Sequence, residues 1–342
     1  MKEEEAESAT KVIVDESRCE SVAEVLRSIE IVGATEDHSL DSVPRVILPD
    51  FYFVLVAICH QTSPIDAPPL SGVAKDGRAY TGWDYLRRRL ADRVEVDNGI
   101  VSIPWLLQCK ASDLERLFED EKGARTLSDA SGRAALLRQL AETLRTLGIR
   151  SASEFMGLSD GWLEQASGSG LYDILGQFEA YSDPVKKKSC FFLELMRIEC
   201  QWRYRDPVHL GPPVDYHEVR GHLRLGTVKI CDPNLLRKVS EKQNVTAEED
   251  IAIRQAVYDA IFAIAEKHGK AQPSVLHYLF WNLFRNCCLR DTPHCQDCGK
   301  VCRLPSRYRD AFRVHRCLFQ AICPSATVSS RLVEHQHVTT YY

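Results

Sequence analysis

The chain has 342 residues, of which 44% are hydrophobic and 27% are charged, values that are ordinary for a globular protein with two modest domains or one large domain. No apolar run reaches the roughly 18–20 residues of a membrane span, and the acidic start lacks the apolar core of a signal peptide, so we expect a chain that is neither secreted nor embedded in a membrane. Thirteen cysteines then suggest a reducing compartment, either the cytoplasm or, in a eukaryote, the nucleus, where clustered cysteines bind metal more often than they form disulfides.

The net charge of -5 is unevenly distributed along the chain. From Asp183 onward there are 24 Lys and Arg against 17 Asp and Glu, whereas the preceding residues have 19 against 31. A basic C-terminal part is typical of a surface that contacts a phosphate backbone, although a solvated charged surface would have the same composition.

Helical patterns dominate the chain. Residues 1–44 show little periodicity, and we interpret them as an acidic, partly disordered leader. An apolar stretch at 51–60 predicts a buried helix, and further helical patterns lie at 80–86, 112–118, 130–147, 152–156, 171–181 and 250–268. Because no alternating strand of useful length is present, the sequence predicts a mostly α-helical fold. We expect one helical domain at 45–270, followed by a helix and a Cys-rich module at 271–342.

Three successive lysines, Lys186 to Lys188, precede an apolar helical pattern at 189–196. Successive positions on a helix face different directions, so the three amines do not share one environment. A solvated face is the ordinary interpretation of such a run. The alternative is that one of the three amines belongs to a functional site.

The segment from Pro212 to Gly226 has clear helix boundaries at both ends. Prolines cannot continue a helix and Asp is a strong N-cap, so a helix is predicted from Asp215 to near Gly226. An Asp in this position has two uses. It caps the helix, or it presents a carboxylate, supported by backbone amides and the helix dipole, to a cationic transition state.

Seven of the thirteen cysteines lie within residues 287–323, a density that indicates a metal site. Six residues separate Cys288 from Cys295 and two separate Cys295 from Cys298, a spacing that suits an iron–sulfur cluster just after a helix. A structural zinc that uses Cys295, Cys298, Cys317 and Cys323 is the alternative. Cysteines that bind no metal are the third interpretation.

These segments resemble the helix–hairpin–helix base-excision DNA glycosylase superfamily. Residues 214–220 are similar to the segment that carries its catalytic Asp, and residues 188–196 are similar to the Lys-bearing helix of archaeal 8-oxoguanine glycosylases. Residues 277–298 resemble the end of the endonuclease III branch, where an iron–sulfur loop follows a helix. Residues 50–265 also resemble, in the order of their features, the queuosine salvage glycosylase family, which lacks a cysteine cluster.

The sequence departs from these patterns in three places. Phe284 replaces the Gly that precedes Arg285 in the endonuclease III pattern, and no Gly-rich DNA-binding hairpin stands before Asp215. Leu304 occupies the position of the expected last Cys. Either Cys302 takes its place, or an insertion brings in Cys317 or Cys323.

The resemblance implies a two-lobed helical fold of the helix–hairpin–helix glycosylase type with a C-terminal metal-binding cysteine loop. It implies an N-glycosylase that releases a modified or damaged, flipped-out base from DNA through an oxocarbenium-like transition state. The alternatives are a hydrolase of queuosine 5′-phosphate and a non-catalytic nucleic-acid-binding module. Asp215 is the expected catalytic carboxylate and Lys188 the second catalytic residue, with lyase activity left open.

The remaining site residues fall into three groups. Residues expected to contact the base are His217, Tyr216, Trp83 and Trp202, and residues expected to contact DNA are Arg220, Arg285 and Arg290. Residues expected to bind the metal, a [4Fe–4S] cluster or alternatively zinc, are Cys288, Cys295, Cys298 and either Cys317 or Cys323.

Overall fold

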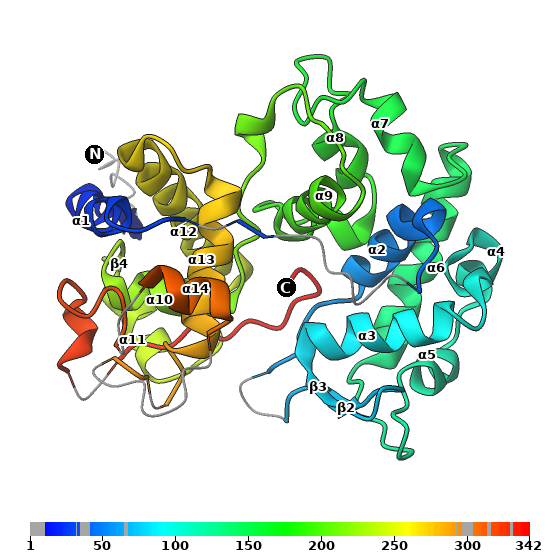
Figure 1. Cartoon of the computed structure of the whole chain (residues 1–342), viewed down its shortest axis with the longest axis horizontal. Helices are drawn as coiled ribbons and strands as arrows, with labels where there is room; N and C mark the ends of the chain where they lie inside the picture. Colours follow the sequence, from blue (N-terminus) through cyan, green and yellow to red (C-terminus); the bar gives the residue numbers. More distant parts are fainter. Residues whose placement is uncertain are drawn as a thin grey trace, which may run out of the picture. The chain divides into compact units, whose positions relative to one another are not determined.

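The computed structural model describes residues 11–31, 33–34, 42–64, 68–291, 293–295, 304–312, 316–328 and 331–342. The described chain is mostly α-helical, with 14 α-helices, short 3-10 helices and four strands of three residues each (Figure 1). The predicted helical fold class is therefore confirmed. The chain forms two compact units, unit 1 from Met1–Ala34 and Val214–Val338, and unit 2 from Thr35–Pro213 and Thr339–Tyr342.

Unit 1 is organised around its longest helix, α12 (Ala247–His268). A capping box between Thr246 and Glu249 begins this helix, and Gly269, at φ 78°, ends it. The other elements of the unit are β1 (Val12–Val14), α1 (Glu16–Arg27), α10 (Tyr216–Leu225), β4 (Val228–Ile230), α11 (Pro233–Ser240), α13 (Pro273–Asn286), α14 (Ser306–Phe312) and the 3-10 helix η7 (Pro324–Ala326).

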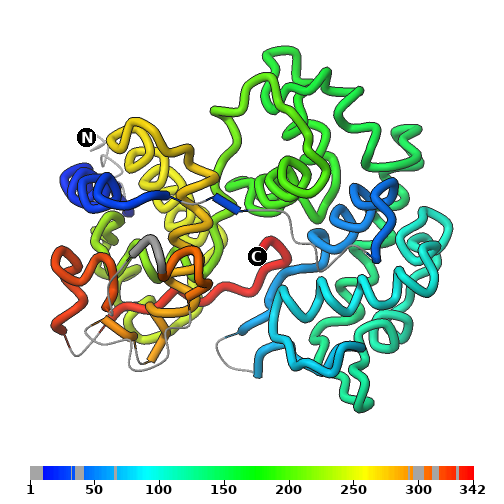
Figure 2. Tube along the Cα trace, in the orientation of Figure 1, coloured from blue at the N-terminus to red at the C-terminus, as the bar shows by residue number. Residues whose placement is uncertain are grey.

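Strand β1 and helix α1, from the N-terminal part of the described chain, belong to unit 1. Strand β1 pairs antiparallel with β4, with Val12 opposite Ile230 and Val14 opposite Val228. Helix α1 buries Cys19, Val22, Ala23 and Leu26, and it packs against α12, so that the blue and yellow helices of Figure 2 lie side by side. The described part of the expected leader is thus ordered, because α1 has an apolar face that α12 covers.

Unit 2 contains the rest of the helices. Its elements are η2 (Arg45–Ile47), α2 (Leu48–Ala57), β2 (Ser71–Val73), β3 (Ala79–Thr81), α3 (Gly82–Val94), η3 (Asn98–Val101), α4 (Ile103–Gln108), α5 (Ala111–Leu117), α6 (Ala130–Thr146), η4 (Ala152–Glu154), α7 (Phe155–Leu158), α8 (Leu171–Gly176), η5 (Glu179–Tyr181), α9 (Lys187–Glu199) and η6 (Pro207–His209). Helix α6 packs against α4 and α5, and α2 packs against α9.

The centre of unit 2 is aromatic. Phe53 on α2 lies between 5.0 and 5.6 Å, ring centroid to ring centroid, from four other rings, those of Phe155, Phe178, Tyr181 and Phe192. Helix α2 is buried on all sides, as its uniformly apolar sequence predicts.

The boundary between the units falls between Pro213 and Val214, one residue before Asp215. This division differs from the expected domains at 45–270 and 271–342, because α10 and α12 pack against α13, and α12 also packs against α1. Helix α11 packs against β4 of the same unit. Within the described residues, each helix is either too short or too polar to cross a lipid bilayer.

Candidate functional site

Asp215 is the N-cap of α10, as its sequence predicts. Its Oδ1 accepts hydrogen bonds from the backbone N–H of His217 at 2.7 Å and of Glu218 at 3.3 Å. The backbone N–H of Asp215 donates in return to Glu218 Oε2 at 3.4 Å, which completes a capping box. Gly226, at φ 76°, ends the helix. Asp215 as a residue is half-buried.

Helix α13 supports both carboxylates of this capping box. Trp281 Nε1–H donates to Asp215 Oδ2 at 3.0 Å, and His277 Nδ1 lies 2.8 Å from Glu218 Oε1. Glu218 is fully buried and His277 is 4% exposed. His277 and Trp281 are four residues apart and therefore share one face of α13. Asp215 thus receives three hydrogen bonds from two helices.

His217 and Tyr216 lie beside the Asp215 carboxylate on the first turn of α10. Arg220 Nη2 lies 2.8 Å from His217 Nδ1. Because a guanidinium only donates, Nδ1 accepts and the other ring nitrogen of the neutral imidazole carries the proton. Burial, together with the nearby Arg220, Arg285 and Arg290, lowers the pKa of His217 well below its usual value. His217 is therefore a neutral hydrogen-bond donor at physiological pH.

Arg220 and Arg290, both expected to bind DNA, pair with a buried carboxylate of the protein. Arg220 is 2% exposed and donates to Glu334 Oε2 and to the carbonyl of Cys288, both at 2.8 Å. Arg290 pairs with the same buried Glu334, and its guanidinium carbon lies 5.4 Å from the Tyr216 ring centroid. This placement corrects the expectation for Arg220, whose guanidinium stabilises the fold instead of facing a phosphate.

Arg285 is the third of these arginines, and it is half-buried at the surface of α13. Its guanidinium carbon lies 4.7 Å from the ring centroid of Trp281, a cation–π contact. The Trp281 indole therefore makes two contacts: its ring lies beside the Arg285 guanidinium, and its N–H donates to the Asp215 carboxylate.

Lys188, Trp83 and Trp202 belong to unit 2. Lys188 is fully buried, and its amine donates to the carbonyl of Ala57. Burial lowers the pKa of Lys188 to about 7, with Lys187 and Arg133 acting in the same direction. The ring centroids of Trp83 and Phe191 are 4.6 Å apart, and those of Trp202 and Phe192 are 6.0 Å apart. Both half-buried indoles thus pack on α9, the helix of Lys188.

Neither the models of known protein families nor the curated proteins contain a match to this chain.

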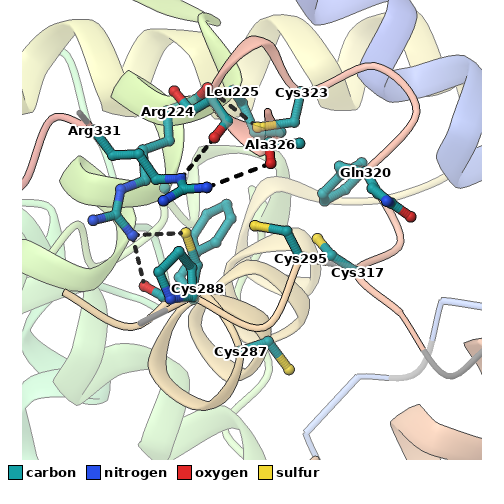
Figure 3. A pocket seen from close by; sticks show the side chains of 15 residues that line it. Arg224, Leu225, Cys287, Cys288, Cys295, Cys317, Gln320, Cys323, Ala326 and Arg331 are labelled. Atoms are coloured by element: carbon teal, nitrogen blue, oxygen red, sulfur yellow. Dashed lines mark hydrogen bonds between the residues drawn. The ribbon is translucent and has the colours of Figure 1, made fainter. Parts of the chain in front are cut away.

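Four of the cysteines expected to bind metal line one cavity of unit 1, together with Arg224, Phe284 and Arg331. The sulfurs of Cys288, Cys295, Cys317 and Cys323 all lie around this cavity, whereas that of Cys287 points away from them (Figure 3). None of the cysteines in the described residues forms a disulfide. Cys298 and Cys302 lie outside the described residues.

The surroundings of these sulfurs combine burial with one nearby guanidinium group. Burial raises the pKa of Cys295, and it raises that of Cys323 to about 11, the neighbouring thiols adding to the effect. Arg224, which is 2% exposed, donates to Cys288 Sγ at 3.3 Å. Burial disfavours the thiolate form of Cys295 and Cys323, and among the described residues no group of three or more His, Cys, Asp or Glu side chains is placed to hold a metal ion. Metal binding at this cavity therefore stays a prediction.

Gly221 explains how Phe284 is accommodated beside the cavity. Phe284 stands where the endonuclease III pattern has Gly, and a Cβ built on Gly221 of the facing helix α10 would overlap the Phe284 ring. Gly221 therefore leaves the room that the Phe284 ring occupies, and Phe284 is compatible with close packing of α10 against α13.

Some residues that contact the expected site residues were not predicted from the sequence, because their partners are distant along the chain. His277 and Trp281 share a helix face, a signal that was available, but nothing local indicates that they contact Glu218 and Asp215. Glu334 lies 114 residues from Arg220, and no sequence pattern connects them.

Proposed function

We propose that this protein is an N-glycosylase that hydrolyses the N-glycosidic bond of a modified or damaged base in DNA, with Asp215 as the catalytic carboxylate. The observation that carries the proposal is the arrangement at the start of α10. There, one half-buried carboxylate is held by two backbone amides and by the Trp281 indole.

The chemistry requires a carboxylate in a defined position. As the bond between C1′ and the base nitrogen breaks, positive charge develops on the sugar, and a carboxylate close to the ring stabilises that charge. A water oxygen then bonds to C1′ and loses a proton, and the departing base gains a proton. Asp215 would act by electrostatic stabilisation and by orienting the water.

Features around Asp215 support DNA as the substrate. Tyr216 offers an aromatic ring and His217 a neutral N–H donor on the same helix turn, and both are groups that recognise an extruded base. Arg285, half-buried on the adjacent helix, suits a phosphate contact. A two-lobed helix–hairpin–helix fold with a cysteine loop at its C-terminal end is part of this proposal. Trp83 and Trp202 remain proposed base contacts.

Queuosine 5′-phosphate is the second substrate that we propose to test, because the resemblance to the salvage family spans both units. A small nucleotide has few charges, so its hydrolysis would depend weakly on salt, whereas DNA cleavage would fall steeply as salt rises. If Asp215 only caps α10 in a non-catalytic nucleic-acid-binding module, neither substrate would be cut.

Measurement of base release from DNA and from a free nucleotide distinguishes these proposed functions. The full chain is incubated with duplex DNA that carries 8-oxoguanine and, separately, with queuosine 5′-monophosphate. Asp215→Asn is the test variant, because Asn is also a good N-cap and should keep α10 folded. The matched control is Asp232→Asn, since Asp232 caps α11 with the same two-amide geometry. We expect release from DNA by the wild type and the control, with a loss of about 100-fold or more in Asp215→Asn.

Each other outcome has a definite meaning. Release from the nucleotide alone would replace DNA with a free nucleotide as the substrate. Equal release by wild type and Asp215→Asn would overturn the role of Asp215, and no release from either substrate would contradict both substrate proposals.

Lyase activity is tested by borohydride trapping of a Lys188 Schiff base. Because Lys188 is fully buried, we expect no trapped complex.

A further inference from the structure

Unit 2 contains a pocket whose lining residues have no role in the proposed function. The pocket is lined by residues of α2, η3, α4 and α6. Helix α6 packs against α2 and α4, and η3 also contacts both of these helices (Figure 1). We propose that this pocket, called here the α2–α6 pocket, binds a small organic amine, with Asp50 pairing with the ammonium group. The proposal concerns ligand binding alone and does not depend on the proposed glycosylase activity.

The α2–α6 pocket has the size of a small-molecule site. Its volume is about 390 Å³, and sites that bind small molecules typically have volumes of about 300–1,000 Å³. The cavity beside the cysteines, in contrast, has a volume of about 20 Å³, which is room for about one water. Volume therefore distinguishes the α2–α6 pocket as a place where an organic ligand would fit.

Most of the pocket wall is apolar and buried. Leu140 and Leu144 are four residues apart and share one face of α6, and Phe53 and Val54 come from α2. Val101 of η3 adds a further apolar side chain. All five residues are buried, so they would contact the apolar body of a ligand and favour its binding by removing apolar surface from water.

Asp50 is the acidic residue of the lining. It lies in the first turn of α2. Its Oδ2 accepts a hydrogen bond from Ser151 Oγ at 2.8 Å, and its Oδ1 accepts one from the backbone N–H of Ala152 at 2.7 Å. An ionised carboxylate offers about four acceptor positions. About two positions therefore remain for a donor on the ligand, while the two existing bonds fix the orientation of the carboxylate.

The charge of Asp50 is not balanced by a cation of the protein. Among the described residues, no Lys, Arg or His forms an ion pair with it. Burial raises the pKa of Asp50, and the nearby Glu154 acts in the same direction. Arg150 also lines the pocket, but its side chain is 87% exposed and its guanidinium pairs with Glu154 at 2.9 Å. A bound ammonium group would offset the burial of the carboxylate, and an anion would be repelled.

Matched small molecules test both the apolar and the charged part of this proposal. The probes are tryptamine, phenethylamine and cyclohexylethylamine, each compared with the alcohol and the carboxylate that share its apolar body. Methyl NMR spectra of the full chain, labelled at Ile, Leu and Val, are recorded during titration with each probe. We expect at least one amine to bind with a Kd of about 1 mM or lower and to shift the methyl signals of Val54, Val101, Leu140 and Leu144. The matching alcohol should bind about 10-fold more weakly or worse, because it cannot form a charged hydrogen bond with Asp50.

Three variants locate the site. Asp50→Asn removes the charge but keeps an oxygen that accepts hydrogen bonds, and it should weaken amine binding by about 10-fold or more without affecting the alcohol. Asp206→Asn is the matched control, because Asp206 is also half-buried and accepts from two backbone amides outside the pocket lining. It should leave amine binding unchanged. Val101→Phe fills part of the pocket and should weaken the binding of amine and alcohol alike.

Several results would overturn the proposal. Equal affinities of an amine and its matching alcohol would remove Asp50 as the anchor, and this comparison uses the wild type, so it holds even if Asp50→Asn fails to fold. Tighter binding of the carboxylates would reverse the argument from charge. Methyl shifts confined to residues outside the lining would place the amine elsewhere, and no shift with any amine would reject the α2–α6 pocket as an amine site. Base release from DNA bears on none of these results.

Discussion

Trp281 Nε1 lies 3.0 Å from Asp215 Oδ2, so a residue of α13 holds the carboxylate at the start of α10. The backbone amides of α10 bond only the other oxygen of the carboxylate. The indole therefore restricts rotation of the Asp215 side chain in a way that capping alone does not.

Replacing Trp281 by Phe should slow base release without weakening DNA binding. Phe keeps an aromatic ring beside Arg285 but removes the N–H, and a hydrogen bond to a charged group contributes about 1.5–3 kcal/mol. If that bond acts in the transition state, kcat should fall by about 10-fold or more. Single-turnover kinetics and DNA affinity are measured side by side. Trp105→Phe in α4 is the control, and a fall in affinity with unchanged kcat would exclude the positioning role.

Arg285→Ala should weaken DNA binding uniformly across sequences. Arg285 and Arg290 are both half-buried, and Arg290 pairs with Glu334, so Arg285 is the arginine that we choose for this test. Removal of one phosphate contact should reduce the slope of log affinity against log salt by about 1. Fluorescence anisotropy with duplex DNA over a salt series measures this, and Arg237→Ala on α11 is the control. An unchanged salt slope would show that Arg285 does not contact phosphate.

Asp250→Asn should strongly destabilise unit 1. Asp250 and Arg254 are 1% and 0% exposed. The carboxylate of Asp250 bonds Arg254 at 2.9 Å and His335 at 2.7 Å. Removing one charge leaves a buried guanidinium uncompensated, at a cost of about 3–5 kcal/mol in the free energy of unfolding. Urea unfolding measures the change. Glu241→Gln, in an exposed pair with Arg237, should have little effect, and equal effects of the two variants would contradict this explanation.

Lys188→Met should change the pH dependence of stability. Burial lowers the pKa of Lys188 to about 7 in the folded chain, against about 10.4 in an unfolded chain. Between these values the unfolded state binds a proton that the folded state does not, so this residue makes the wild type more stable as pH rises from about 7 to 10.4. The slope is about 1.4 kcal/mol per pH unit.

Below pH 7 both states hold the proton of Lys188, and the contribution is constant. Urea unfolding of the wild type and of Lys188→Met at several pH values isolates the effect, because other titrating groups are common to both. The free energy of unfolding of the wild type should rise with pH relative to that of Lys188→Met, since Met has no amine to deprotonate. A difference that is independent of pH would mean that Lys188 keeps its ordinary protonation in the folded chain.

The cysteines of residues 287–323 illustrate a limit of sequence spacing, because spacing alone does not predict which of these thiols lie together. Two residues separate Cys298 from Cys295, so a local motif favours Cys298. In the iron–sulfur interpretation, Cys317 and Cys323 were alternatives for the last ligand. The structure brings both of these thiols to the cavity. Cys298 lies outside the described residues.

By itself, the sequence determined the helical class of the fold and the boundaries of α10, from Asp215 as N-cap to Gly226 at the C-terminal end. Both depend on interactions within a few residues, in which capping groups and apolar periodicity act on the local backbone. Only the tertiary structure decided that Trp281 bonds Asp215, that Arg220 is buried against Glu334 and that Lys188 is closed to solvent. These contacts join residues up to 131 positions apart, and they exist only because packing of the helices brings distant side chains together.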